Sequence, residues 1–281
     1  MSDNNSDDGD DLLDFLDAFQ PVQEPSRPLP LAETDDEPEW REPQAPLLIA
    51  KKGARMPAVL AETLSLSPGQ YHPRSDRHSV IKCLGLLFDL LELRPDLAQA
   101  IQEGRLTVGI NTPVNGKALD LALGTPAIWN HQRPPRSLGD LAQAVGLDVN
   151  PFQNLLEGRI KMPLLAVEAK AIMTDHAGAL PRLTDELERF RHRFGPETKA
   201  VGLVLVNVAQ TFQSPLRNTQ THHRQPNDAL KVVQAMFDLP LRVGMLFLDC
   251  PNDGSPITPR NLGPDHLTYE ALLRELAQQV Q

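Results

Sequence analysis

Residues 201–208, Val-Gly-Leu-Val-Leu-Val-Asn-Val, form an almost continuous apolar run that decides the fold class. A Val-rich run of this length is typical of a β-strand that is buried on both faces. Residues 243–250, Val-Gly-Met-Leu-Phe-Leu-Asp-Cys, repeat the pattern, and residues 227–236 between the two runs have helical spacing. Buried strands that alternate with helices indicate a layered α/β domain.

The segments before residue 201 add three strands to this pattern. Residues 105–112 and 117–123 alternate between apolar and polar side chains, and Asn115-Gly116 between them is a strong signal for a two-residue hairpin. A third strand is expected over residues 162–171. Helical spacing of apolar residues predicts helices over 77–93, 181–194 and 267–280.

Charged side chains occupy two of the predicted strands. In Leu165-Ala-Val-Glu-Ala-Lys170 alternate residues share a face, so Glu168 and Lys170 project together. Asp120 is a lone acid in the preceding strand, on the side opposite to its leucines. Burial of a charge is costly unless the charge is paired or bound to a ligand. If the two strands are neighbours, two carboxylates and a lysine converge, and the alternative is a surface Glu–Lys pair on an edge strand.

Such a set of side chains suits the hydrolysis of a phosphodiester bond. Two carboxylates, with backbone oxygen and water, are the ligands that Mg²⁺ prefers, and Mn²⁺ is a substitute. A bound divalent ion polarises a phosphoryl oxygen and lowers the pKa of a bound water. Lys170 would orient that water or neutralise the charge that develops on phosphorus. We therefore predict Asp120, Glu168 and Lys170 as catalytic residues, with Asp120 and Glu168 as the metal ligands.

Asp120 and the Glu168-Ala-Lys170 triplet, followed by an amphipathic helix and a buried strand, resemble the PD-(D/E)XK nuclease superfamily, which has the restriction-endonuclease-like fold. The resemblance covers roughly residues 76–250. It departs from the motif at Leu119, where the motif has Pro, and in the long gap between Asp120 and Glu168. The resemblance implies an α/β fold with a central mixed sheet flanked by helices. It also implies Mg²⁺-dependent endonuclease activity on DNA and a homodimer or larger assembly.

The acidic, proline-rich composition predicts a disordered tail at residues 1–54, and the nuclease-like domain is expected at residues 55–281. Residues 125–160 are looped out of that domain as a small helical insert. Restriction or phage defence is the biological setting expected for such an enzyme.

Residues 137–158 of the insert resemble a helix-turn-helix. Ala142 is the small residue that two closely crossing helices need, and Gly146 suits a turn with positive φ. The second helix would carry amide side chains toward base edges, but it is poor in Arg and Lys, and phosphate contacts dominate affinity for DNA. The insert is therefore either a DNA-reading element or a small structural or dimerisation subdomain.

Five further residues are candidates for contact with nucleic acid. Three follow the motif strand, whose end opens onto the predicted site, and two belong to a basic patch before the helix at 227–236. They are Thr174, His176, Arg182, His223 and Arg224. The alternative for the basic patch is a solvated loop with no catalytic role.

The charge of the chain is concentrated in its tail. Residues 1–50 carry 14 acidic and 2 basic side chains, whereas the rest of the chain carries 23 acidic and 25 basic ones. The tail is also rich in proline and is predicted to be disordered. Four apolar residues in it fall on one face of a short helix, namely Leu12, Phe15, Leu16 and Phe19. This segment is a docking peptide for a protein partner or an acidic flap over a basic groove, and the alternative is a solubilising tail.

The sequence also bears on location. No apolar run reaches the ~18 residues that a membrane span needs, and the acidic N-terminus argues against a secretory signal. Cys83 and Cys250 lie in apolar runs, which favours buried thiols in a reducing cytoplasm. Two other functions stay open. One is a non-catalytic DNA-binding or regulatory protein that uses the insert on a nuclease-like scaffold, and the other is an interaction factor whose tail recruits a partner.

Overall fold

The computed structural model describes residues 56–65, 77–114, 116–128, 135–147, 151–173, 176–214, 219–222, 227–260, 262 and 265–280. All of them belong to the second of two units, Ala50–Gln281, and the first unit is Met1–Ile49. The acidic tail with its predicted docking face lies outside the described residues, and so do Thr174, His223 and Arg224.

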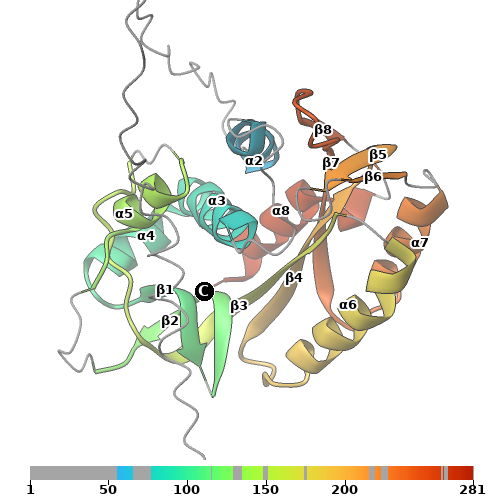
Figure 1. Ribbon diagram of the computed structural model, residues 1–281. Coiled ribbons are helices and arrows are strands. Elements are labelled where there is room, and N and C mark those ends of the chain that lie inside the picture. Colours follow the sequence, from blue (N-terminus) through green and yellow to red (C-terminus); the bar gives the residue numbers. More distant parts are fainter. Residues whose placement is uncertain are drawn as a thin grey trace, which may run out of the picture. The chain divides into compact units, whose positions relative to one another are not determined.

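A mixed six-stranded sheet forms the centre of the described part of the chain (Figure 1). Its strands follow the order β1-β2-β3-β4-β7-β8. The pairs β1–β2, β2–β3 and β7–β8 are antiparallel, and β3, β4 and β7 are parallel to one another. The bounds are Thr107–Val114 (β1), Lys117–Pro126 (β2), Ile160–Ile172 (β3), Lys199–Asn207 (β4), Arg242–Asp249 (β7) and Thr258–Arg260 (β8). A separate hairpin pairs β5 (Thr211–Ser214) with β6 (Thr219–His222).

Helices flank this sheet. They are α2 (Met56–Ser65), α3 (Arg77–Leu93), α4 (Pro95–Gln102), α5 (Leu138–Ala144), α6 (His176–Arg191), α7 (Asn227–Phe237) and α8 (Tyr269–Gln279), with a 3-10 turn, η1, at Asp265–Leu267. The predicted α/β class with a mixed sheet between helices is therefore confirmed. No helix within the described ranges has the length and apolar character needed to cross a lipid bilayer.

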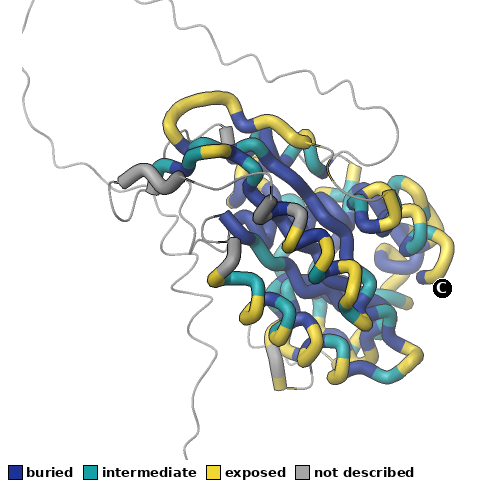
Figure 2. The backbone as a smooth tube through the Cα atoms, turned by 90° about the vertical axis from the view of Figure 1, so that its right-hand side faces the viewer, coloured by how far each residue is buried: buried dark blue, intermediate teal, exposed yellow. Residues whose placement is uncertain are grey.

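Two glycines show which helices cover which face of the sheet. Gly202 on β4 lies against Leu187 of α6. Gly244 on β7 pairs with Leu203, the next residue of β4, and lies against Leu272 of α8. Because successive residues of a strand point to opposite faces, α6 and α8 lie on opposite sides of the sheet. α7 packs beside α6, and α3 packs beside α8 (Figure 1). The central strands β4 and β7 are buried almost along their whole length, whereas the helices expose their outer sides (Figure 2).

Most predicted elements are confirmed. The helix expected over 77–93 is α3 with the same bounds, and the apolar runs at 201–208 and 243–250 are β4 and β7. Val114 pairs with Lys117 and Gly116 has φ +79°, which confirms the predicted hairpin. The helix expected over 181–194 begins earlier, at His176, with Pro181 inside it.

The helix-turn-helix resemblance of the insert is wrong in its second half. α5 is capped by a reciprocal Ser137–Asp140 capping box, and Gly146 has the predicted positive φ, +78°. Residues 151–158, however, form bends, turns and bridges rather than a helix. Their carbonyls are committed elsewhere, because Leu155 and Gln153 accept hydrogen bonds from the first backbone N–H groups of α5. Of the two interpretations of the insert, this geometry fits a small structural element.

Asn207 ties together the carboxyl ends of the three parallel strands. Its buried carboxamide donates to the carbonyl oxygens of Met173 (3.2 Å) and Cys250 (2.9 Å), which follow β3 and β7. It also accepts from the N–H groups of Ala209 (3.1 Å) and Cys250 (3.0 Å). The Asn207 side chain thus supplies the hydrogen-bond partners that backbone groups at the ends of these strands would otherwise lack.

Asp89 has a similar role between helices. This buried carboxylate of α3 accepts from the Tyr269 hydroxyl of α8 (2.6 Å) and from the Met56 N–H of α2 (3.0 Å). Burial, and then the neighbouring Asp89, raise the pKa of Tyr269 well above its usual value, so its hydroxyl stays a donor. The contact joins α8 to the two consecutive helices α2 and α3, which are far from it in sequence.

Cys83 and Cys250 are both free and buried, as predicted. Burial raises the pKa of both thiols, and that of Cys250 reaches about 12. Neither thiol therefore has the thiolate character that a reactive cysteine needs.

Candidate active site

The three predicted catalytic residues meet where β2 separates from β3. The antiparallel register of these strands runs from Pro126↔Ile160 to Leu121↔Val167. Asp120 and Glu168 are the next residues on the two strands. We call this place, formed by Asp120 and residues 168–170, the divergence point.

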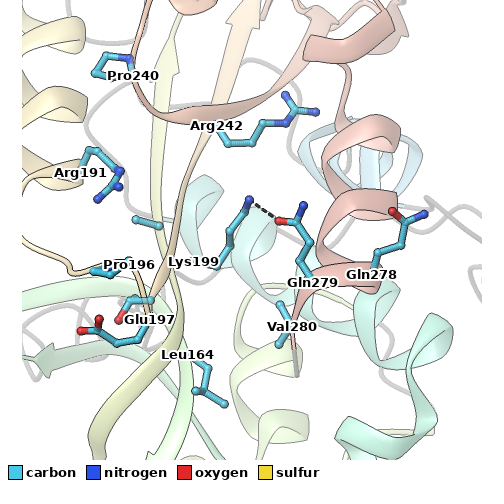
Figure 3. Close-up of a pocket in the computed structure, with 12 residues that line it drawn as sticks. Leu164, Arg191, Pro196, Glu197, Lys199, Pro240, Arg242, Gln278, Gln279 and Val280 are labelled. Atoms are coloured by element: carbon cyan, nitrogen blue, oxygen red, sulfur yellow. Dashed lines mark hydrogen bonds between the residues drawn. The ribbon is translucent and has the colours of Figure 1, made fainter.

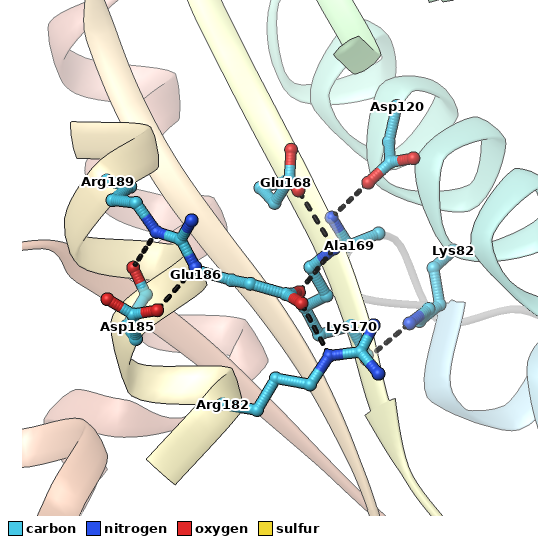
Figure 4. Close-up of polar contacts among 9 residues, drawn as sticks. All are labelled: Lys82, Asp120, Glu168, Ala169, Lys170, Arg182, Asp185, Glu186 and Arg189. Atoms are coloured by element: carbon cyan, nitrogen blue, oxygen red, sulfur yellow. Dashed lines mark hydrogen bonds and ion pairs between the residues drawn. The ribbon is translucent and has the colours of Figure 1, made fainter. Parts of the chain in front are cut away.

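A direct contact crosses the divergence point. The Oδ2 atom of Asp120 accepts a hydrogen bond from the backbone N–H of Ala169, 2.6 Å away (Figure 4). Ala169 is the residue between Glu168 and Lys170, so the aspartate lies beside the glutamate–lysine pair. Asp120 is half-buried, and Glu168 is 3% exposed.

Lys170 is held by two carboxylates. Its ammonium nitrogen lies 2.9 Å from Oε1 of Glu168 and 3.1 Å from Oε2 of Glu186, which belongs to α6. Glu186 in turn accepts from Nε of Arg182, one turn earlier on the same helix (2.7 Å). Glu168 pairs with Gly202 of β4, and a side chain at Gly202 would point toward α6. Glu168 and Lys170 therefore lie on the face of the sheet that α6 covers, where they meet Glu186.

Lys82 approaches the same point from the other layer. Its side chain is completely buried in α3, and its Nζ donates to the backbone oxygen of Lys170, 2.6 Å away (Figure 4). Sequence reasoning missed Lys82 and Glu186. The signal for Lys82 was a single charge in the apolar segment 79–88, and the signal for Glu186 was its position four residues after Arg182.

Beyond Val167, side chains therefore replace the hydrogen bonds that β2 would make to β3, while the pairing of β3 with β4 continues to the end of β3. Buried backbone groups need hydrogen-bond partners, and past the last β2–β3 pair the N–H of Ala169 is satisfied by Asp120. The carbonyl of Lys170 is satisfied by Lys82. Asp120 and Lys82 thus satisfy the backbone of β3 at Ala169 and Lys170, where β2 no longer pairs with it.

The electrostatics at the divergence point favour a cation. Burial, and then the negative charge of Glu168, raise the pKa of Asp120, while the Ala169 N–H and the two lysines oppose that rise. Burial lowers the pKa of Lys82 to about 8. Burial also acts to lower the pKa of Lys170, but Glu168 and Glu186 outweigh it and the net shift is upward. Lys170 is thus cationic at neutral pH.

The donor set fits a hard divalent ion. Asp120 and Glu168 offer carboxylate oxygens, and their proximity disfavours a charge on Asp120 unless a cation is near. Among the described residues no group of three or more His, Cys, Asp or Glu side chains is arranged around a metal position. An ion at this place would complete its shell with backbone oxygen and water, which Mg²⁺ accepts because it retains several waters.

The other predicted nucleic-acid contacts are placed only in part. His176 is the first residue of α6, and Arg182 lies on the same helix with 83% of its side chain exposed. Arg182 reaches the site through its ion pair with Glu186. Thr174, His223 and Arg224 stay predictions, because they fall in the gaps between the described ranges.

A cavity of about 780 Å³ lies away from the divergence point (Figure 3). It is lined by Arg191 and by Lys199 and Arg242, the first residues of β4 and β7. Glu275 of α8 pairs with both Lys199 and Arg242 at 2.6 Å. None of the predicted site residues lines this cavity. Lys170 lies beside Val204 of β4, five residues after Lys199, and so toward the other end of the strand.

The chain matches no protein-family model, no curated protein and no solved structure. The function is therefore argued from the geometry of the divergence point.

Proposed function

We propose that the chain is a Mg²⁺-dependent endonuclease that hydrolyses phosphodiester bonds of DNA. One observation carries the proposal: Asp120 reaches the backbone between Glu168 and Lys170, at 2.6 Å, where β2 leaves β3. Two carboxylates and a lysine are thus gathered from separate strands, although burying them is costly. The likeness of these residues to the PD-(D/E)XK motif supports the same chemistry.

The residues have separable roles in this proposal. Asp120 and Glu168 would hold the ion, which supplies Lewis-acid activation of the phosphoryl group and of a water. Lys170, kept charged by Glu168 and Glu186, would orient the attacking water or neutralise negative charge at phosphorus. Lys82 fixes the backbone of Lys170 from behind the strand and so restricts where the ammonium can point.

The alternative of a non-catalytic DNA-binding protein depended on the insert. Its recognition element was the second helix of the helix-turn-helix, and residues 151–158 do not form one. The three-residue convergence, in contrast, is what hydrolysis requires. We therefore favour the hydrolytic function.

Cleavage of DNA tests the proposal directly. The full chain would be incubated with supercoiled plasmid and with single-stranded DNA, in Mg²⁺, in Mn²⁺ and in EDTA. We expect metal-dependent cleavage that Lys170→Ala reduces by about 100-fold. Lys161→Ala is the matched control, because Lys161 is an exposed lysine on the same strand. A wild-type chain that cleaves neither substrate, or a Lys170→Ala variant as active as the control, would contradict the proposal.

A further inference from the structure

Two residues other than glycine have a left-handed backbone in the described part of the chain, Asn111 (φ +47°) and Asn252 (φ +57°). This conformation is unfavourable for residues with a side chain, although Asn tolerates it better than most. At Asn252 the structure supplies a reason. Its buried carboxamide donates to the backbone oxygen of Gln213 at 2.7 Å, which joins the loop after β7 to β5.

Asn111 makes no comparable side-chain hydrogen bond within the described residues to stabilise its left-handed backbone. It lies in the middle of β1, where regular extended backbone is the rule, and its side chain is half-buried. Among the residues that the structure describes, none forms a hydrogen bond or ion pair with this side chain. The conformational cost at Asn111 is therefore not offset by an internal bond of its carboxamide.

The register places Asn111 at the divergence point. Ile110 pairs with Leu121 and Thr112 pairs with Leu119, so Asn111 stands directly across from Asp120, yet these two residues do not pair. β1 bends sharply here, since a Cβ added to Gly109 would lie 2.6 Å from Cβ of Thr112. The irregularity of β1 and the separation of β2 from β3 thus occur at the same level of the sheet.

A neutral hydrogen-bond donor suits the chemistry of the divergence point. The charged groups at and beside it are the carboxylates of Asp120, Glu168 and Glu186 and the ammonium groups of Lys82 and Lys170. The substrate of a nuclease is itself an anion. A carboxamide donates through its NH₂ without adding negative charge. Strained backbone that the fold does not explain is typical of residues retained for function.

We propose that Asn111 is a substrate-binding residue whose Nδ2 donates a hydrogen bond to a non-bridging oxygen of the phosphodiester. This inference rests on the proposed nuclease function and adds a residue that the motif does not contain.

The test compares glycine and aspartate at position 111 with glycine at position 252. Asn111→Gly removes the carboxamide and relieves the left-handed backbone, so we expect a melting temperature at or above that of wild type and a KM for DNA raised about tenfold. Asn111→Asp keeps the tolerance for positive φ but replaces the donor by a negative charge, and it should raise KM further. Asn252→Gly should instead lower the melting temperature and leave the KM of the folded enzyme unchanged.

The outcomes separate this inference from the function on which it rests. If wild type cleaves DNA and both variants at position 111 retain its KM, the role of Asn111 is overturned and the nuclease function stands. If Asn111→Gly instead lowers the melting temperature and leaves the KM of the folded enzyme unchanged, as Asn252→Gly should, Asn111 is structural and the inference is again overturned. A wild-type chain without cleavage in Mg²⁺ or Mn²⁺ removes the proposed function and this inference together.

Discussion

Lys82→Met tests how the divergence point is held together. The substitution removes a completely buried ammonium group and keeps an unbranched side chain of similar volume. Two effects oppose each other at neutral pH. The carbonyl of Lys170 loses its donor, which costs about 1–3 kcal/mol, but a buried charge disappears as well.

The size of the second effect follows from the pKa of Lys82. Burial lowers it from 10.5 to about 8, and each pKa unit corresponds to about 1.4 kcal/mol, so the charged form costs the folded state about 3 kcal/mol. Between these two pH values the unfolded chain binds more protons than the folded chain, and stability therefore rises with pH. The contribution is fully present above pH 10.5 and is lost as the pH falls through 8.

Urea unfolding from pH 7 to pH 10.5 in EDTA would measure this contribution. The free energy of unfolding of wild type minus that of Lys82→Met should increase by about 3 kcal/mol across the range. At pH 7 the two proteins should differ by less than about 2 kcal/mol, because the two effects nearly cancel.

Lys161→Met supplies the control, since it removes an exposed lysine from β3, the strand whose backbone Lys82 contacts. Titrating groups that do not interact with Lys82 are common to all three proteins and cancel in the difference. A wild-type minus Lys82→Met difference that stays constant with pH, or that falls as pH rises, would refute the account of Lys82 as a buried cation at the divergence point.

Three further predictions concern the frame of the site. Asn207→Ala should lower the free energy of unfolding by about 3–5 kcal/mol, because it leaves several buried backbone groups without partners; a loss below about 1 kcal/mol in urea unfolding would contradict this. Asp89→Asn should cost about 2 kcal/mol by weakening the contact with Tyr269, whereas an unchanged melting temperature would count against it. Burial acts to raise the pKa of Glu275, but its bonds to Lys199 and Arg242 outweigh this and lower it. The wild-type advantage over Glu275→Gln should therefore be present above pH 4.5 and vanish as the pH falls below it. Solvent screening should keep that advantage below about 1 kcal/mol in acid titration followed by circular dichroism.

The sheet could be predicted from sequence because its strands carry strong local signals. β4 and β7 are apolar along their whole length, and the Asn-Gly pair sets the β1–β2 register. The side-chain period of two then places Glu168 and Lys170 on one face without further information. The convergence with Asp120 followed because β2 and β3 proved to be neighbours.

Other features depend on packing that no local pattern reports. Lys82 and Glu186 reach Lys170 from two helices on opposite faces of the sheet, so their role is fixed only when both layers are in place. The early start of α6 was hidden by Pro181, since proline is favoured at the first helical position but here lies inside the helix. The hairpin of β5 and β6 is short and polar and lacks the alternation that marks a strand.

The hydrogen bonds from the side chains of Asp120 and Lys82 to the backbone of β3 constrain which substitutions this sequence can accept during evolution. Asp120 and Lys82 each satisfy a main-chain group, so loss of either leaves a backbone N–H or carbonyl group without that partner. The ammonium of Lys170 pairs with the side chains of Glu168 and Glu186 rather than with a main-chain group. If the proposed function holds, descendants that abandon it should therefore replace Lys170 first and retain Asp120 and Lys82. A lineage that varies Asp120 while it preserves Lys170 would show the opposite order of loss.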